Sequence, residues 1–317
     1  MPYSSLHYPQ YSLYISVKLL SDLCYNINKM FTPNEVRKMF NIKKSLLCIS
    51  AISCMSLYAA DIAVDSDITI GSTPSVPTET GYNYWLDGKT YVFNNNSGKY
   101  WKANEQVTID KDYILKLITD YTDCYCYFVL ECFNTFTNNG NVRIDNHGTL
   151  GLNNYTSTNN GTIDIINGKI ALYSGAILNN KGTITSTGSS RIYVTSSSTL
   201  NNKGTIDISN ITDLSRWYND GTFTLKGGST FILPKSITNK INTYRWKKPI
   251  TLNGTKDKPV NIVIPKDCEY ITNINNKKEL FSTIKEETGF TFNGNKHNVK
   301  FSRQTSLDNE CEYVDEC

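Results

Sequence analysis

The sequence predicts an all-β protein built as a right-handed parallel β-helix, a β-solenoid with an N-terminal β cap and a small α+β C-terminal region. The first observation is an internal repeat: Leu-Asn-Asn-Lys-Gly-Thr-Ile occupies residues 178–184 and again residues 200–206, and Asn-Asn-Gly-Thr-Ile occupies residues 159–163. The second is that β-branched residues follow each Gly in strand-like alternation. A repeat of 20 to 22 residues with such strands is typical of stacked coils.

Asparagines mark the turns of the repeat. We place successive coils at Asn139, Asn159, Asn179 and Asn201, with a shorter coil near Asn219. Asn and Gly adopt left-handed backbone angles easily, and stacked Asn side chains can hydrogen-bond from one coil to the next. The residues predicted for this turn ladder are Asn159, Asn179 and Asn201.

Inward-facing residues recur at fixed places after each turn, because the side chains of a strand alternate between its two faces. The first strand of each coil supplies the predicted core stack, which comprises Val142, Ile163, Ile184, Ile206 and Phe223. The second strand supplies Leu150, Ile170, Ile192 and Phe231, and a third face carries Leu178 and Leu200. The coil from Asn201 departs from the pattern at residues 211–217, which predicts a bulge or a short helix.

The recurring Asn-x-Gly-Thr-Ile text resembles the passenger regions of bacterial autotransporters and related surface adhesins, over roughly residues 107–233. The resemblance implies a right-handed parallel β-helix and surface exposure more strongly than any activity. The chain departs from the autotransporter pattern because it stops at Cys317 without a long run of alternating strands for a membrane barrel. We therefore expect a released or partner-held protein, or a truncated reading frame.

The N-terminal part has the order of a secretory signal peptide. A short basic segment at residues 39–44 precedes an apolar run at residues 45–58, and small residues then precede Asp61. We predict a signal peptide at residues 39–60, cleavage after Ala59 or Ala60, and no transmembrane span in the mature chain. Residues 1–38 are then a leader from a start codon placed too early, and translation begins at Met39.

Export makes disulfide bonds the expected state of the mature cysteines, although the sequence does not select their connectivity. The disulfide candidates are Cys124, Cys126, Cys132, Cys268, Cys311 and Cys317. A metal site at residues 124–132 is the weaker alternative, because no His lies near these cysteines and no second Cys pair of zinc-site spacing follows. We expect no metal.

The solenoid is predicted at residues 107–233, with an N-terminal cap at residues 61–106. Asp87 and Gly88 lie between strand-forming residues and predict a two-residue hairpin turn. The aromatic residues of this region are Tyr84, Trp85, Tyr91, Tyr100 and Trp101. We favour packing of these rings over the open end of the solenoid, and a carbohydrate-binding platform is the alternative.

Residues 234–317 form the predicted C-terminal cap region, because the repeat fades after Pro234. Residues 277–288 have apolar side chains at helical spacing, with Gly289 as a C-terminal stop. Residues 290–292 and 299–301 have strand character. Residues 245–249 place basic side chains around Trp246, which we interpret as a solvated loop rather than a binding patch.

Composition and motifs argue against several classes of function. A formal charge of +3 over 317 residues gives no electrostatic footprint for nucleic acid. The sequence has no phosphate-binding Gly loop ahead of a helix, and His147 and His297 lie in no nucleophile or metalloprotease motif. We expect no cofactor.

Parallel β-helices also include polysaccharide hydrolases and lyases, so the outward column of the first strand is tested for catalytic residues. This column comprises Arg143, Asp164, Thr185, Asp207 and Thr224. Asp164 and Asp207 would lie about 9–10 Å apart, near the upper limit for the two carboxylates of an inverting glycosidase. Small Thr neighbours offer little burial for a general acid, so a glycan-active enzyme is the alternative and not the expectation.

These observations predict an adhesin-like binding or structural protein without catalysis, secreted or exposed on a bacterial cell surface. The expected partner is a host glycan, a matrix protein or another surface protein. Nucleic acid is not an expected partner.

Overall fold

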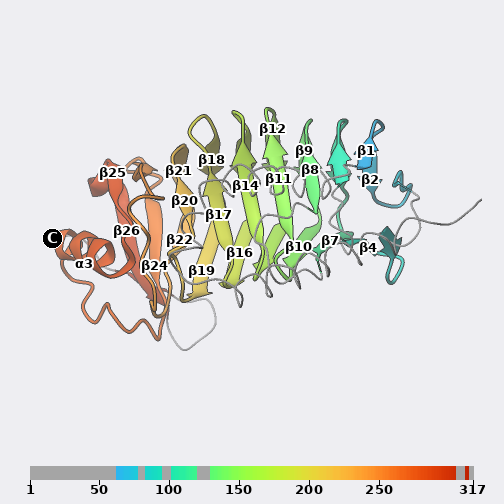
Figure 1. The fold of residues 1–317 in the computed structure, drawn as a ribbon. Coiled ribbons are helices and arrows are strands. Elements are labelled where there is room, and N and C mark those ends of the chain that lie inside the picture. Colours follow the sequence, from blue (N-terminus) through green and yellow to red (C-terminus); the bar gives the residue numbers. More distant parts are fainter. Residues whose placement is uncertain (1–61, 78–82, 95–100, 120–128, 305–310, 314–317) are drawn as a thin grey trace, which may run out of the picture. The chain divides into compact units, whose positions relative to one another are not determined.

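Parallel sheets form a β-solenoid of about six turns in the computed structural model of the protein (Figure 1). The structure describes residues 62–77, 83–94, 101–119, 129–304 and 311–313, which belong to a unit spanning Ala59–Cys317. Strands account for 50% of the structure and helices for 7%, so sheets enclose the core. The predicted all-β solenoid is confirmed. The predicted leader, the signal peptide and its cleavage sites Ala59 and Ala60 lie outside the described residues.

Each central coil crosses three sheets, which we number I, II and III in the order in which a central coil such as β10, β11 and β12 crosses them. Sheet I contains β3 (Asn83–Trp85), β4 (Thr90–Asn94), β7 (Ile114–Ile118), β10 (Asn141–Asp145), β13 (Thr162–Ile166), β16 (Thr183–Gly188), β19 (Thr205–Ile211), β22 (Thr230–Ile232), β24 (Val260–Ile264), β26 (Val299–Gln304) and β27 (Cys311–Tyr313). Sheet II contains β1 (Ile62–Val64), β5 (Trp101–Ala103), β8 (Leu130–Cys132), β11 (Thr149–Asn153), β14 (Lys169–Tyr173), β17 (Arg191–Val194) and β20 (Tyr218–Asn219). Sheet III contains β2 (Ile68–Ile70), β6 (Val107–Ile109), β9 (Phe136–Asn138), β12 (Thr156–Asn159), β15 (Ile177–Asn180), β18 (Thr199–Asn202), β21 (Thr222–Lys226), β23 (Ile250–Asn253) and β25 (Phe292–Gly294). The helices are α3 (Lys277–Thr288) and the short 3-10 helix η1 (Lys296–Asn298).

A column of fully buried aliphatic side chains fills the inner face of sheet I. Its paired members are Val142, Ile163, Ile184 and Ile206. The predicted core stack is confirmed for these four residues and is wrong for the fifth, because Ile206 pairs next with Phe231 and not with Phe223. Each such side chain contributes about 1.5–3 kcal/mol by its burial, so the column stabilises the stacking of the coils.

Phe223 lies on sheet III, where it pairs with Leu200 and Ile250. Asn219 was predicted to start a new coil, but it ends the two-residue strand β20 on sheet II, so the strand that follows it belongs to sheet III and not to sheet I. Phe231 is displaced for the same reason, from the predicted second-strand stack to sheet I. Both rings are fully buried, so the prediction was wrong about the sheet and correct about burial.

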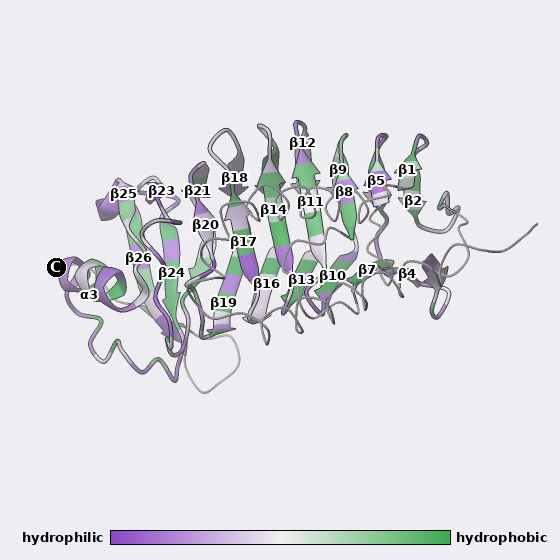
Figure 2. Ribbon diagram, in the orientation of Figure 1, coloured by the Kyte–Doolittle hydropathy of each residue, from purple (hydrophilic) through white to green (hydrophobic). Residues whose placement is uncertain are grey.

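The other predicted stacks are confirmed. On sheet II, Leu150 pairs with Ile170, and Ile170 pairs with Ile192. On sheet III, Leu178 pairs with Leu200. Figure 2 shows hydrophobic segments recurring on the strands of successive coils, as expected where one face of each strand points inside.

The coil from Asn201 is irregular, as predicted, but its bulge precedes residues 211–217. The register of β19 against β16 shifts between Thr185 and Thr187, and β19 continues to Ile211. A turn follows instead of a helix, and it leads to Trp217, which is fully buried. The Nε1 of Trp217 donates a hydrogen bond to the carbonyl of Ser190 at 2.9 Å, so the buried indole has a polar partner.

A tight corner joins sheet III to sheet I in successive coils. Its glycines Gly161, Gly182 and Gly204 do not have positive φ angles. A Cβ added to Gly182 would lie 1.9 Å from the carbonyl oxygen of Gly161, and one added to Gly204 would lie 2.0 Å from that of Gly182. The prediction that these glycines adopt left-handed backbone angles is therefore wrong at this corner. Glycine is required here because the stacked backbones leave no room for a side chain.

A buried Asn ladder crosses the coils beside this corner. Its fully buried members are Asn138, Asn159, Asn180 and Asn202, and each Nδ2 donates to the Oδ1 of the next at 2.7 Å. The prediction is confirmed for Asn159 and is wrong for Asn179 and Asn201, which lie on the outer face with a separate contact at 3.2 Å. The reason is register: Asn159 pairs with Asn180, one residue later than the assumed repeat.

Parallel coils extend beyond the predicted solenoid limits of residues 107–233. On the N-terminal side, β1 pairs with β5 and β2 pairs with β6. On the C-terminal side, β24 and β26 continue sheet I, and β23 and β25 continue sheet III. The segments predicted as caps therefore contribute coils as well.

The N-terminal hairpin closes one edge of sheet I. Antiparallel β3 and β4 are joined by a loop in which Gly88 has φ 76° and Asp87 accepts hydrogen bonds from the N–H groups of Lys89 and Thr90 at 3.0 and 2.6 Å. Leu86 donates its N–H to the carbonyl of Thr90, so the loop is longer than the predicted two-residue turn. The side chain of Asp87 stabilises this longer loop.

Three of the five aromatic residues noted in the sequence, Trp85, Tyr91 and Trp101, pack against the core, as favoured from the sequence. Trp101 is fully buried, and the rings of Trp85 and Tyr91 meet edge to face with centroids 5.1 Å apart. Tyr91 also donates its hydroxyl to the carbonyl of Pro77 at 2.8 Å, and burial raises its pKa to about 12. Tyr84 is exposed, and Tyr100 lies outside the described residues.

The C-terminal cap contains the predicted helix α3. The Asn276 side chain accepts from the N–H of Glu279 at its start, and Gly289 ends it with φ 81°. Its buried face includes Phe281, whose ring lies 5.6 Å from that of Phe292 and 5.1 Å from that of Phe301. The helix therefore packs on the last strands of sheets I and III.

The predicted basic loop at residues 245–249 has two parts. Trp246 is buried, with its ring 5.4 Å from that of Phe290. Lys247 is exposed and pairs with Asp220 at 2.9 Å. The indole therefore belongs to the core and is not part of a surface patch.

Candidate functional site

Outward-facing side chains of sheet I form the column that sequence analysis singled out. The column in register comprises Lys116, Arg143, Asp164, Thr185, Asp207 and Ile232. The prediction is confirmed from Arg143 to Asp207. It is wrong at Thr224, which lies on sheet III because β21 follows the short strand β20.

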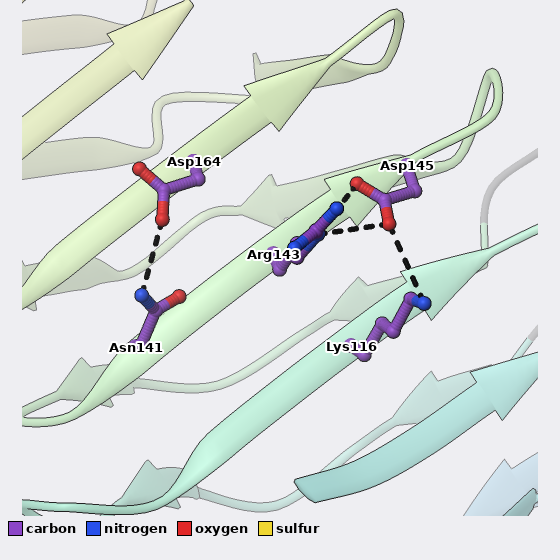
Figure 3. A network of polar contacts seen from close by, with 5 residues as sticks. All are labelled: Lys116, Asn141, Arg143, Asp145 and Asp164. Carbon is purple, nitrogen blue, oxygen red and sulfur yellow. Dashed lines mark hydrogen bonds and ion pairs between the residues drawn. The ribbon is translucent and has the colours of Figure 1, made fainter.

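Arg143, Lys116 and Asp145 form an ion-pair network across β7 and β10 (Figure 3). The Nε of Arg143 donates to the two carboxylate oxygens of Asp145 at 3.0 and 2.9 Å, and the Nζ of Lys116 lies 3.5 Å from Oδ2. The side chain of Arg143 is 50% exposed and that of Asp145 is 10% exposed. The network links neighbouring coils and leaves the guanidinium accessible to solvent.

Asp164 accepts hydrogen bonds from both adjacent coils. Nδ2 of Asn141 donates to its Oδ2 at 3.1 Å, and Oγ1 of Thr185 donates to its Oδ1. Figure 3 shows the amide of Asn141 directed at this carboxylate. These contacts link the Asp164 side chain to the strands on both sides of it.

Asp207 has a local partner instead. Its Oδ1 accepts a hydrogen bond from the backbone N–H of Ser209 at 2.8 Å, within the bulged strand β19. Thr185 lies between Asp164 and Asp207 in the column, so the two aspartates are two coils apart, about 9–10 Å along the solenoid. The structure confirms their common face but gives each carboxylate a hydrogen-bond donor within the protein.

The two aspartates lie on the outer face of sheet I. Both are partly exposed on the sheet surface. A cavity of about 170 Å³ lies elsewhere, beside α3, and is lined by Phe281, Lys285, Phe290, Thr291, Phe292 and Lys296. Within the described ranges, no group of three or more His, Cys, Asp and Glu side chains could hold a metal ion.

A cluster of three tyrosines on the outer face of sheet II was missed by sequence analysis: Tyr193 pairs in register with Tyr218, and Tyr173 lies two residues after Ala171, the other partner of Tyr193. The rings of Tyr193 and Tyr218 stack with centroids 4.3 Å apart and planes at 12°, and Tyr173 lies 6.2 Å from Tyr193. The Nζ of Lys247 is 6.0 Å from the centroid of the Tyr218 ring. Because the faces of Tyr193 and Tyr218 are turned toward each other, this pair stabilises coil stacking and offers no flat platform to a sugar. The irregular coil separates Tyr193 from Tyr218 by more residues than the repeat has, which conceals their pairing in the sequence.

Two of the six disulfide candidates are free thiols. Cys132 and Cys268 are both buried and unpaired, so the disulfide prediction is wrong for them. Cys132 lies opposite Leu152 on the inner face of sheet II. It packs in the core as a small apolar side chain. Cys124, Cys126 and Cys317 lie outside the described residues, and for Cys311 the structure describes only the strand.

We expect Cys132 to resist alkylation in the folded protein. Burial raises the pKa of its thiol, so both access and the thiolate population are reduced. Iodoacetamide labelling followed by peptide mass mapping should leave Cys132 unmodified in buffer and label it in concentrated urea. Rapid labelling in buffer would contradict its position in the core.

Comparison with known protein families, with curated proteins and with solved structures found no match to this chain. The candidate site is therefore interpreted from its own residues. No helix in the part of the chain that the structure describes is both long enough and apolar enough to span a membrane.

Proposed function

We propose that this protein is an adhesin-like β-solenoid, secreted or displayed on a bacterial surface, that binds a glycan or matrix partner and performs no catalysis. The observation that carries the proposal is that both candidate catalytic carboxylates accept hydrogen bonds from neighbouring groups of the protein. Asp164 accepts hydrogen bonds from Asn141 and Thr185, and Asp207 accepts one from the backbone of Ser209. Both aspartates act as structural acceptors on an open sheet face.

The geometry of the coils supports binding to an extended partner. Equivalent outward positions recur about every 4.8 Å along each sheet, so polar groups are presented in straight columns. Solenoids use such surfaces to bind partners over many repeats. The predicted signal peptide and the resemblance to autotransporter passengers support placing this surface outside the cell.

Replacing Asp164 and Asp207 together with asparagine tests the absence of catalysis. We expect neither the wild-type protein nor this double variant to cleave any member of a polysaccharide panel, as measured by release of reducing ends. We also expect the urea unfolding midpoint to change little, because Asn keeps most of the hydrogen-bonding shape of Asp. Cleavage by the wild type that is lost in the variant would establish the alternative, a glycan-active enzyme.

Surface placement has a separate test. Protease added to intact producing cells should digest the protein, while a cytoplasmic control protein stays intact. Purified protein should bind at least one component of an array of host glycans and matrix proteins. A protein that is protected on intact cells, absent from the medium and unable to bind any component would rule out the adhesin function.

A further inference from the structure

Three lysines form a row at the corner where the chain leaves sheet III for sheet I. The row comprises Lys181, Lys203 and Lys226, which directly follow Asn180, Asn202 and Leu225, three residues paired in register on successive coils. Lys181 and Lys203 hold the same place in the two identical copies of the repeat. Lys181 and Lys203 are exposed and Lys226 is half-buried. The lysine backbones therefore follow one another at about 4.8 Å.

This row has no anionic partner within the described structure. The ion pairs found between described residues involve other cations, and none includes one of these three lysines. Two earlier coils have Asn139 and Asn160 at the same corner, where the Nδ2 of Asn160 donates to the Oδ1 of Asn139 at 2.8 Å. The position that holds an uncharged amide pair in these two coils thus holds adjacent positive charges in the next coils. Like charges opposite one another on neighbouring strands are destabilising, and an anionic ligand would relieve that repulsion.

The outer face of sheet III borders the lysine row and is uncharged over its central strands. One column in register comprises Thr137, Thr158, Asn179, Asn201, Thr224 and Thr251, of which Thr224 is buried and the other five are partly exposed and accessible to a ligand. The next column comprises Thr156, Ile177, Thr199 and Thr222. Hydroxyl and amide groups can both donate and accept hydrogen bonds, as sugar hydroxyls do, and the Thr methyls and Ile177 add apolar contact. We call these two columns the sheet III strip.

We propose that the lysine row and the sheet III strip together bind a linear anionic glycan. Its carboxylate or sulfate groups would contact Lys181, Lys203 and Lys226, and its hydroxyls would contact the Thr and Asn side chains of the strip. The six strands that carry the strip, from β9 to β23, span about 24 Å, which suits several sugar units of an extended chain. This inference rests on the proposed binding function and names its ligand class.

Charge and composition favour a glycan over nucleic acid at this surface. A duplex presents dense phosphate charge and is usually met by many Lys and Arg contacts. Here three lysines border a wide neutral strip, and the formal charge of the whole chain is only +3. A partner with intermittent anionic groups and many hydroxyls fits that distribution better.

The test uses the full-length mature protein and three variants. The triple variant Lys181→Gln, Lys203→Gln, Lys226→Gln removes the row, and the triple variant with Arg at the same positions keeps its charge. A charge-matched control replaces Lys111, Lys266 and Lys278, which are exposed elsewhere, with Gln. Binding to immobilised heparin, polygalacturonate, dextran and duplex DNA is measured at two salt concentrations, after circular dichroism has verified folding.

We expect wild-type binding to heparin or polygalacturonate, weakened about tenfold or more in the Gln triple variant. The Arg variant and the charge-matched control should bind within about threefold of wild type, and dextran should bind weakly. Equal loss in the control, or equal binding of DNA through the same lysines, would show nonspecific charge attraction and overturn the proposal. Failure to bind either anionic glycan would also overturn it. If the protein still bound a neutral glycan or a matrix protein, the broader adhesin function would stand.

Discussion

Replacing Asn180 with alanine is expected to lower the free energy of unfolding by about 3 kcal/mol. Asn180 is fully buried and donates its Nδ2 to the Oδ1 of Asn202 at 2.7 Å and to the carbonyl of Thr205 at 3.0 Å. Its own Oδ1 accepts from Asn159 at 2.7 Å. The substitution removes three hydrogen bonds and leaves the buried side chains of Asn159 and Asn202 without the groups to which they were bonded. The urea midpoint, followed by circular dichroism, measures the loss.

The neighbouring residue provides the control for this prediction. Asn179 lies on the same strand with its side chain on the outer face, where it accepts a hydrogen bond from Asn201 at 3.2 Å. Asn179→Ala should cost less than about 1 kcal/mol, since its groups can hydrogen-bond with water. Similar losses in the two variants would show that the interior ladder does not stabilise the solenoid.

Replacing Gly182 with alanine is expected to destabilise the protein by at least about 3 kcal/mol. The added Cβ would lie 1.9 Å from the carbonyl oxygen of Gly161, a backbone atom that cannot move without displacing the adjacent coil. The corners at Gly161 and Gly204 are stacked above and below it, so any relaxation must spread through several coils. We expect a lower urea midpoint and low soluble yield.

Gly175 separates this steric effect from backbone strain. It has φ 88°, and a Cβ added there would meet nothing within 4 Å. Gly175→Ala should cost only about 1–2 kcal/mol, the penalty for a left-handed conformation in a residue with a side chain. If Gly182→Ala lowered the free energy of unfolding no more than Gly175→Ala, close stacking of the corners would not explain why Gly recurs at this position in successive coils.

Much of the interior could be predicted because burial in a strand depends on short-range alternation. The side chains of Ile163, Ile184 and Ile206 were placed in one stack from the repeat alone, and the structure pairs them. The helix at residues 277–288 was also predictable, because its apolar spacing and the stop at Gly289 are local signals. The predictions that were wrong were those that assumed the number of residues in a whole coil.

The candidate site illustrates the same distinction. The sequence placed Asp164 and Asp207 on one face, and the pairing through Thr185 confirms it. It could not show that Asn141 and Thr185 donate to Asp164, since those contacts depend on which coils are adjacent and how their side chains turn. The interpretation of the aspartates as structural acceptors therefore came from the structure.

The repeat and the alternation within it determined by themselves that this protein is a stacked β-solenoid with an aliphatic core. Only the tertiary structure decided that the buried ladder passes through Asn180 rather than Asn179, that Phe223 belongs to sheet III, and why Gly182 is needed. The physical reason is that a coil has no fixed length. A one-residue difference between turns changes which side chain meets the interior of the next coil, and only the stacked backbone records that register.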